Sequence, residues 1–233
     1  MSTLWLVATP IGNLADLSPR AVDVLAHAGL ICCEDTRRTG LLLQHAGVRA
    51  ERLAVCNDHT EFSRVADVLG VLAGGRDVAI VSDAGTPGIS DPGERIVRAA
   101  IDAGYDVSAV PGPSAAVMAL TISGLAADRF VFEGFLPRKG AERAARLADI
   151  AAEPRTTIIY EAPHRVLRTL DDLPRGTGDT QAPGSYRTRD RGDEALFGFA
   201  ATAQSAKPVL FPPDELLWTG TRTDPADVTA QQT

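Results

Sequence analysis

Short apolar runs alternate with amphipathic segments along the chain from its start to Leu173. Runs of four or five mostly apolar residues, bounded by glycine, proline or charged residues, are typical of strands buried in a parallel sheet. Apolar residues that recur every three or four positions between these runs indicate helices. The predicted strands are 4–8, 30–33, 78–81 and 106–110, and the predicted helices are 19–28, 60–72, 94–103 and one over Leu41 to His45 that ends at Gly47.

This alternation predicts an α/β fold over residues 1–122, with a mostly parallel sheet and helices on both faces. The pattern changes from about Leu125, and the two domains are expected to join near residues 122 to 128. The start of a second, mixed and incomplete α/β domain is predicted over residues 123–173. Its predicted strands are 130–132 and 156–160, and its predicted helices are 141–152 and 166–173.

The sequence after Leu173 differs in composition from everything before it. The segment 174–233 includes nine Leu, Val or Phe and no Ile, whereas ten Ile occur up to Leu173. A segment so poor in large apolar residues buries little core. We therefore expect residues 174–233 to form a poorly ordered tail without strands. A shift of reading frame soon after Leu173 is one hypothesis for its origin.

Composition narrows the class of protein. An apolar content of 45% and a charged content of 23% describe an ordinary globular protein. Cys32, Cys33 and Cys56 are too few for a disulfide framework and lack metal-ligand spacing, which favours a reducing cytoplasm and no metal. The first apolar run is too short for a signal peptide or a membrane span, so we expect no membrane association.

The net charge of −7 argues against nonspecific binding of nucleic acid through a broad cationic surface. It leaves room for an RNA substrate that is held by local basic clusters. Such clusters occur at Arg37-Arg38, at Arg138-Lys139 with Arg143 and Arg146, and at His164-Arg165 with Arg168.

The clearest chemical signal is the loop that follows the predicted strand Val78 to Val81. Residues 82–93 are rich in glycine, proline and small polar residues, and they include Asp83 and Asp91. In an open α/β sheet the ligand crevice lies outside the carboxyl ends of the strands, so we expect a small-molecule site here. We expect Asp83 to serve this site and Asp91 to cap the next helix.

Six motifs together resemble one family. In chain order they are Thr9–Asn13, Glu34-Asp35-Thr36-Arg37, Ser82–Gly93, Pro111–Ala115, Gly134–Lys139 and Tyr160-Glu161-Ala162-Pro163-His164-Arg165. From about Leu4 to Leu173 the chain resembles the bacterial ribosomal RNA small subunit methyltransferase I family. That family lies within the tetrapyrrole methylase (class III) fold of S-adenosylmethionine-dependent enzymes.

The resemblance implies a two-domain α/β enzyme that uses S-adenosylmethionine. Its substrate would be the ribose 2′-hydroxyl of a cytidine in 16S ribosomal RNA, at the decoding centre of the small ribosomal subunit. The resemblance also implies a cytoplasmic homodimer that needs no metal. The donor-binding residues would be Pro10, Ile11, Gly12, Asp83, Ala84, Gly85, Thr86, Ser114 and Ala115.

The family resemblance also implies which residues bind the RNA substrate. Arg and Lys side chains bind phosphates, and an aromatic ring stacks on a splayed base. The residues for this role would be Arg37, Arg138, Lys139, Tyr160, His164 and Arg165. For a base that assists methyl transfer, the candidates are Glu34, Asp35, Glu161 and His164, with Lys139 as an electrostatic helper.

Other interpretations stay open at this stage. Apolar members of the loops can serve core packing, the basic loops can be solvated surface, and Asp35 can pair with Arg37 or Arg38. Another class III methyltransferase, acting on a tetrapyrrole or a protein side chain, is one alternative, which the basic motifs disfavour. An inactive donor-binding protein is another, because the tail departs from the family pattern.

Overall fold

The computed structural model describes residues 2–57, 59–173, 197–202 and 205–210. The chain divides into two compact units, Met1–Ser114 and Ala115–Thr233. This division lies before the boundary expected at residue 122, because helix α5 (Ala115–Ser123) contacts strands of the second unit. Among the described residues, no helix combines the length and the apolar character that a membrane crossing requires.

Five parallel strands form the sheet of the first unit. They are β1 (Thr3–Val7), β2 (Leu30–Cys33), β3 (Leu53–Val55), β4 (Val78–Val81) and β5 (Asp106–Val110). Their order across the sheet is β3-β2-β4-β1-β5, and every neighbouring pair is parallel. All four residues of β2 and of β4 are buried, which is why each is encoded by a continuous apolar run.

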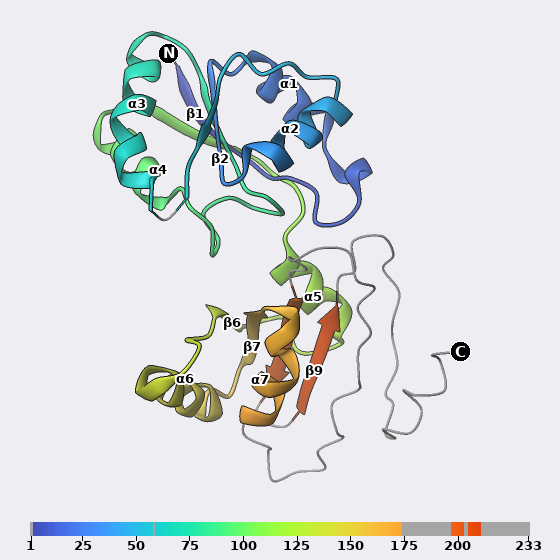
Figure 1. The fold of residues 1–233 in the computed structure, drawn as a ribbon. Helices are drawn as coiled ribbons and strands as arrows, with labels where there is room; N and C mark the ends of the chain where they lie inside the picture. The colour runs from blue at the N-terminus through green and yellow to red at the C-terminus, as the bar shows by residue number, and fades with distance from the viewer. Residues whose placement is uncertain (1, 58, 174–196, 203–204, 211–233) are drawn as a thin grey trace. The chain divides into compact units, whose positions relative to one another are not determined.

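Helices cover both faces of this sheet. Helices α1 (Pro19–His27) and α2 (Thr36–His45) lie on one face, and α3 (Glu61–Ala73) and α4 (Glu94–Asp102) lie on the other (Figure 1). Each face has its own apolar cluster. One contains Leu25, Ile31, Leu43 and Val81, and the other contains Leu4, Val68, Ile80 and Ile96. The α/β architecture predicted for this part of the chain is confirmed.

Side-chain caps determine where the first two helices begin. Ser18 Oγ accepts a hydrogen bond from the Ala21 N–H at 3.1 Å, and Pro19 occupies the first helical position. Asp35 Oδ1 accepts from the Arg37 N–H at 2.8 Å and caps α2 in the same way. These caps fix the far ends of the loops that follow β1 and β2.

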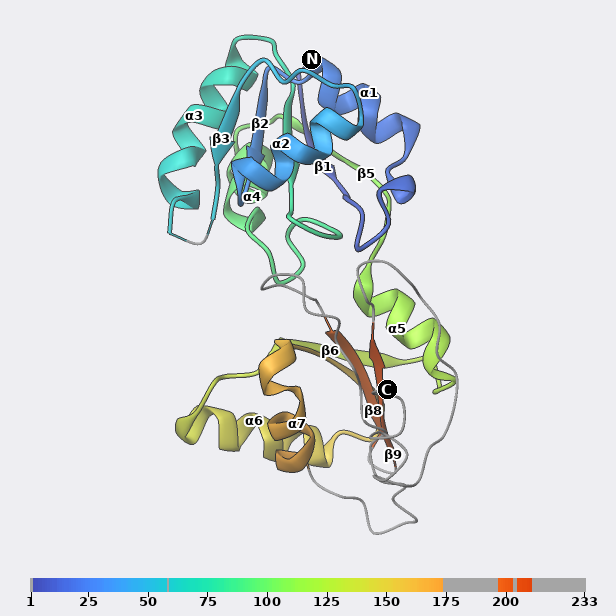
Figure 2. The same cartoon turned by 45° about the vertical axis from the view of Figure 1, so that its right-hand side comes forward.

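The second unit is built on a mixed sheet. Strand β6 (Phe130–Phe135) pairs parallel with β7 (Thr156–Glu161), and β7 pairs antiparallel with β8 (Phe197–Thr202), which pairs antiparallel with β9 (Ser205–Leu210). Helices α6 (Gly140–Ala152) and α7 (Val166–Asp172) lie on one face of this sheet, and α5 lies on the other (Figure 2). Leu136, Ile150, Ile159, Val166 and Leu170 form the core under α6 and α7.

Strands β8 and β9 lie where the sequence predicts none. Their segments, Phe-Gly-Phe-Ala-Ala-Thr and Ser-Ala-Lys-Pro-Val-Leu, contain few β-branched residues, so local propensity does not reveal them. These strands form because the backbone N–H and C=O groups at the edge of β7 pair with those of β8. The prediction of a tail without strands is therefore wrong for these two segments. For residues 174–196, 203–204 and 211–233 it lies outside the described residues.

All three cysteines are buried in the first unit as free thiols. Burial raises the pKa of Cys32 from 9.0 to about 12 and that of Cys56 to about 11, and it also raises the pKa of Cys33. Because the thiolate is the reactive form, a raised pKa and the lack of access both protect these residues from alkylation.

We therefore predict that the folded protein takes up no iodoacetamide at pH 8, whereas the protein in guanidinium takes up three equivalents. Raising the pH to 9.5 accelerates labelling of the unfolded chain, whose thiols have ordinary pKa values, and leaves the folded chain unlabelled. Mass spectrometry of the intact chain measures both. Rapid labelling of the folded chain at pH 8 would contradict the burial of these thiols.

Candidate functional site

Three strand-end loops meet at the carboxyl edge of the first unit's sheet. They follow β4, β1 and β5, which are neighbours in the sheet. Thr9 and Gly85 exchange backbone hydrogen bonds, from the Thr9 N–H to the Gly85 carbonyl at 2.8 Å and from the Gly85 N–H to the Thr9 carbonyl at 3.1 Å. Thr86 Oγ1 donates to the Pro113 carbonyl at 3.1 Å. The fold thus joins the three loops that the sequence singles out.

Glycine allows the loops to approach one another closely. Gly85 has a φ of +95°, and a Cβ at this position would lie 3.4 Å from Ile11 Cγ2 and 3.7 Å from the Pro113 carbonyl oxygen. A Cβ on Gly112 would lie only 2.9 Å from the Cβ of Ala8. A larger residue at Gly112 would push Ala8 aside, whereas at Gly85 the positive φ disfavours a larger residue, whose Cβ would contact both neighbouring loops.

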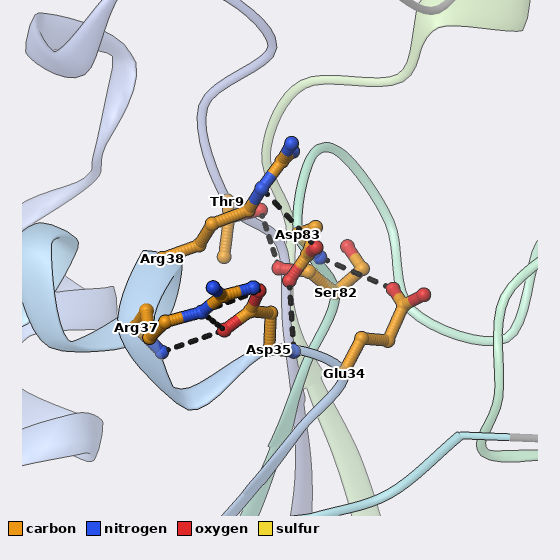
Figure 3. Close-up of polar contacts among 7 residues, drawn as sticks. All are labelled: Thr9, Glu34, Asp35, Arg37, Arg38, Ser82 and Asp83. Carbon is orange, nitrogen blue, oxygen red and sulfur yellow. Dashed lines mark hydrogen bonds and ion pairs between the residues drawn. The ribbon is translucent and has the colours of Figure 1, made fainter. Parts of the chain in front are cut away.

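The loop after β2 joins the same edge through carboxylates, because β2 is the other neighbour of β4. The Asp83 N–H donates to Glu34 Oε1 at 3.2 Å, and the Asp35 N–H donates to Asp83 Oδ1 at 3.2 Å (Figure 3). Arg38 Nε lies 3.7 Å from Asp83 Oδ2. The side chain of Asp83 is therefore held from two sides and is only 16% exposed.

Asp35 is engaged by its neighbour Arg37. The guanidinium of Arg37 donates to both carboxylate oxygens, with Nη2 2.6 Å from Oδ2 (Figure 3). These hydrogen bonds, with that from the Arg37 N–H, lower the pKa of Asp35 from 3.8 to about 2. The open alternative that Asp35 pairs with Arg37 is confirmed.

A cavity of about 360 Å³ opens beside these residues within the first unit. Its volume lies in the range of about 300–1,000 Å³ that small-molecule sites occupy. It is lined by Thr9, Pro10, Leu14, Arg38, Thr39, Leu41, Leu42, Ser82 and Asp83. Two residues named as donor-binding, Pro10 and Asp83, thus contribute to the cavity.

The remaining residues named for the donor lie in the joined loops or next to them. Ile11 and Gly12 follow Pro10, and Ala84, Gly85 and Thr86 follow Asp83. The last two residues of the set lie on either side of the division between the units. Ser114 ends the first unit, whereas Ala115 begins α5 in the second and is buried.

Tyr160, the aromatic residue expected to stack on a base, is only 6% exposed. Its ring packs edge-on against Phe132 and Phe135, with centroid distances of 4.9 and 5.6 Å. Its hydroxyl accepts a hydrogen bond from the Ala116 N–H at 3.1 Å, at the start of α5. This environment gives Tyr160 a role in anchoring α5 to the sheet rather than the expected stacking role.

Glu161, one of the candidate bases, is fully buried at the end of β7. Oε2 accepts from Thr169 Oγ1 at 2.6 Å, and Oε1 forms an ion pair with Arg165. Thr169 in turn accepts from Arg143, whose guanidinium also binds Asp172 and the Pro137 carbonyl. A buried charge must be paired, and this network pairs Glu161 while it ties β7, α6 and α7 together.

The other basic residues predicted to bind RNA differ in exposure. Arg37, Arg138, Lys139 and His164 are exposed, whereas Arg165 is half-buried against Glu161. The exposed side chains can reach a phosphate. Within the described part of the chain, no group of three His, Cys, Asp or Glu is arranged to hold a metal ion.

Glu61 has a role at this edge that the sequence analysis missed. Its buried Oε1 accepts hydrogen bonds from the N–H groups of Gly93, Arg95 and Ile96, at 3.0, 2.9 and 3.4 Å. These are orphan donors at the start of α4, whose N-cap is Gly93 and not Asp91 as predicted. Since Glu61 lies on α3, no local sequence signal links it to the loop that it holds.

Comparison with known proteins agrees with this architecture. A family model described as tetrapyrrole (corrin/porphyrin) methylases matches residues 3–188. Proteins named ribosomal RNA small subunit methyltransferase I are similar to most of the chain. The one from Synechocystis is 52% identical over 173 residues, and the one from Escherichia coli O157:H7 is 50% identical over 178 residues.

These similarities cover 74% and 76% of this chain and 62% of each relative, so the chain spans about three-fifths of the length of the curated relatives it matches. Among solved structures, the uroporphyrin-III-C-methyltransferase from Thermus thermophilus is similar in fold. It superposes with a TM-score of 0.50 and 21% identity, over 74% of this chain and 73% of that one.

The contribution of Glu61 to this edge can be measured by substitution. We predict that Glu61→Ala lowers the free energy of unfolding by about 1–3 kcal/mol, because it leaves buried N–H groups without an acceptor. Glu61→Gln keeps a side-chain carbonyl oxygen and loses less. Urea unfolding followed by circular dichroism measures both variants. An unchanged unfolding midpoint for Glu61→Ala would contradict the capping role.

Proposed function

Because the chain belongs to the tetrapyrrole methylase family, we propose that it transfers a methyl group from S-adenosylmethionine to the 2′-hydroxyl of a cytidine in 16S ribosomal RNA. The observation that carries this proposal is about 50% identity to proteins named ribosomal RNA small subunit methyltransferase I. The acceptor would be presented by the small ribosomal subunit, at its decoding centre. We also propose that the protein works as a homodimer in the cytoplasm.

The residues of the joined loops fit such a donor. Gly85 is buried and has no side chain, so the loops that contain Ile11 and Pro113 lie close to its backbone. The carboxylate of Glu34 lies on the same edge, where it accepts from the Asp83 N–H, and it complements a cationic sulfonium. The backbone of Ile11, Gly12, Ala84, Gly85 and Thr86 would hold the donor, and Ser114 and Ala115 would complete its contacts.

When it is bound, S-adenosylmethionine supplies a methyl group that an oxygen nucleophile can displace in line from sulfur. The ribose hydroxyl is a very weak acid, so alignment of the hydroxyl with the methyl group provides much of the rate. Hydrogen bonds that fix the loops against one another, between Thr9 and Gly85 and between Thr86 and Pro113, support this alignment.

The environment of each acid narrows the choice of a base. Asp35, with a pKa of about 2, is too weak a base to accept a proton efficiently near neutral pH. Glu161 is fully buried and bound to Arg165 and Thr169. Glu34 at the carboxylate cluster and His164 on the surface of the second unit are the residues we propose for this step, with Lys139 as an electrostatic helper.

For the RNA, we propose that the exposed side chains of Arg37, Arg138, Lys139 and His164 bind phosphates. Positive charges confined to a few loops suit a protein of net charge −7 that recognises one site in a large RNA. Arg165 contributes less in this proposal, because its guanidinium is held by Glu161.

A second candidate is a protein that binds the donor without turning it over. The observation that favours it is the composition of residues 174–233, which include nine Leu, Val or Phe and no Ile and depart from the family pattern. Methyl transfer itself separates the two candidates.

We predict that the purified protein, incubated with labelled S-adenosylmethionine and small ribosomal subunits that lack the modification, places label in one 2′-O-methylcytidine. Nuclease digestion and mass spectrometry of the nucleosides identify the product. Donor binding by calorimetry without any transferred label would overturn the proposal in favour of the second candidate.

Gly85→Ala and Gly104→Ala provide a matched pair for this assay. Both residues have positive φ values, +95° and +79°, so each substitution lowers the free energy of unfolding by about 1–2 kcal/mol. Only the Cβ at Gly85 enters the space between the loops, since nothing lies within 4 Å of a Cβ at Gly104. We expect the rate of transfer to fall by at least about tenfold in Gly85→Ala and to persist in Gly104→Ala. Equal rates would contradict the placement of the donor.

A further inference from the structure

We propose that the cavity of about 360 Å³ in the first unit binds the pyrimidine base of the acceptor nucleotide, and that Arg38 and Asp83 select cytosine over uracil. This inference rests on the proposed function, because it names the residues that read the substrate of the same site. It assigns to the cavity a ligand other than the methyl donor.

The walls of the cavity suit a flat, mostly apolar ring. Pro10, Leu14, Leu41 and Leu42 supply apolar surface from two separate segments, the loop after β1 and helix α2. Leu14 is 47% exposed and Leu41 is 68% exposed, so two large apolar side chains border one opening. Pockets of this kind, apolar with a few convergent polar groups, are the usual form of a small-molecule site.

The polar groups of the cavity match one edge of cytosine. Cytosine presents an amino donor at N4 and acceptors at N3 and O2, whereas uracil presents an acceptor at O4 and a donor at N3. A carboxylate accepts from the cytosine N4 amino group, and a guanidinium donates to ring acceptors. Asp83 and Arg38 line the same cavity with 3.7 Å between Oδ2 and Nε, so they offer an acceptor and a donor side by side.

Asp83 is oriented for this role by backbone contacts. Its Oδ1 accepts from the Asp35 N–H, and its own N–H donates to Glu34 Oε1. A guanidinium carries five N–H donors, so one arginine can hold a carboxylate and donate to a base at the same time. Uracil would place its O4 oxygen against the Asp83 carboxylate, which is repulsive.

The position of the cavity also fits an acceptor. Pro10 and Asp83 belong both to the lining of the cavity and to the loops proposed to hold the donor. A base in the cavity therefore brings its attached ribose to the edge of those loops. A nucleobase site far from them could not present the 2′-hydroxyl to the methyl group.

Binding of free nucleotides tests the assignment without methyl transfer. Cytidine 5′-monophosphate and uridine 5′-monophosphate are titrated into the full chain, and NMR chemical shifts of the first unit report binding. We expect cytidine 5′-monophosphate to bind about tenfold more tightly, with the largest shifts at residues that line the cavity. Equal affinities, binding of neither nucleotide or shifts elsewhere would overturn the proposal.

Asp83→Asn adds a second readout, because the amide can donate to uracil O4. We expect it to abolish or invert the preference for cytosine. Asp67→Asn is the matched control, since Asp67 also pairs with arginines, Arg52 and Arg64, but lies outside the cavity. It should keep the preference. An unchanged preference in a folded Asp83→Asn variant contradicts the assignment.

The two proposals fail separately. If the nucleotide preference is found but no methyl group is transferred to the small subunit, the assignment of the cavity is supported and the proposed activity is rejected. If cytidine is methylated but neither nucleotide binds in the cavity, the proposed activity is supported and the assignment of the cavity is rejected.

Discussion

The backbone pairing of Thr9 with Gly85 is the contact on which the candidate site depends. Parallel strands bring their carboxyl ends to one edge, but the loops that follow them have no partner in the sheet ladder and must be held by other bonds. The two hydrogen bonds between Thr9 and Gly85 join the loops after β1 and β4, and Thr86 joins the loop after β5. Three segments far apart in the sequence therefore behave as one surface.

Buried or half-buried carboxylates also join segments of the chain, both around the same edge and in the second unit. Asp83 and Glu34 link the loops after β4 and β2, and Glu61 holds the start of α4. In the second unit Glu161 joins β7 to α7. Each accepts hydrogen bonds from the chain around it, which offsets the cost of removing its charge from water. Of these carboxylates, Asp83 lines the cavity, whereas Glu61 and Glu161 stabilise the fold.

Elements with a strong local signal could be predicted from the sequence. Strands β2 and β4 are buried on both faces, so their apolar runs are continuous, and α1 carries its cap and proline at the expected positions. Strand β3, Leu53–Val55, is too short to show a pattern and was missed. Strands β8 and β9 depend on pairing with β7, which no local pattern contains.

The candidate site was predictable only where its residues are close in sequence. The glycine and proline loops were identified, and the fold joins them. The role of Glu61 was not predictable, since its partners are distant in the sequence and belong to another helix. Tyr160 was assigned to RNA from its motif, but its burial depends on Phe132 and Phe135, which belong to a neighbouring strand.

The central claim, that the joined loops form one donor-binding surface, can be tested directly by amide hydrogen exchange with and without S-adenosylmethionine. The account predicts that the donor slows exchange in residues 9–14 and 82–93 together, because the two loops are bonded to each other. The amides of residues 67–73, in the half of α3 that lies away from Glu61 and the edge, should be unaffected. Protection confined to one loop, or no protection of either loop at saturating donor, would contradict the account.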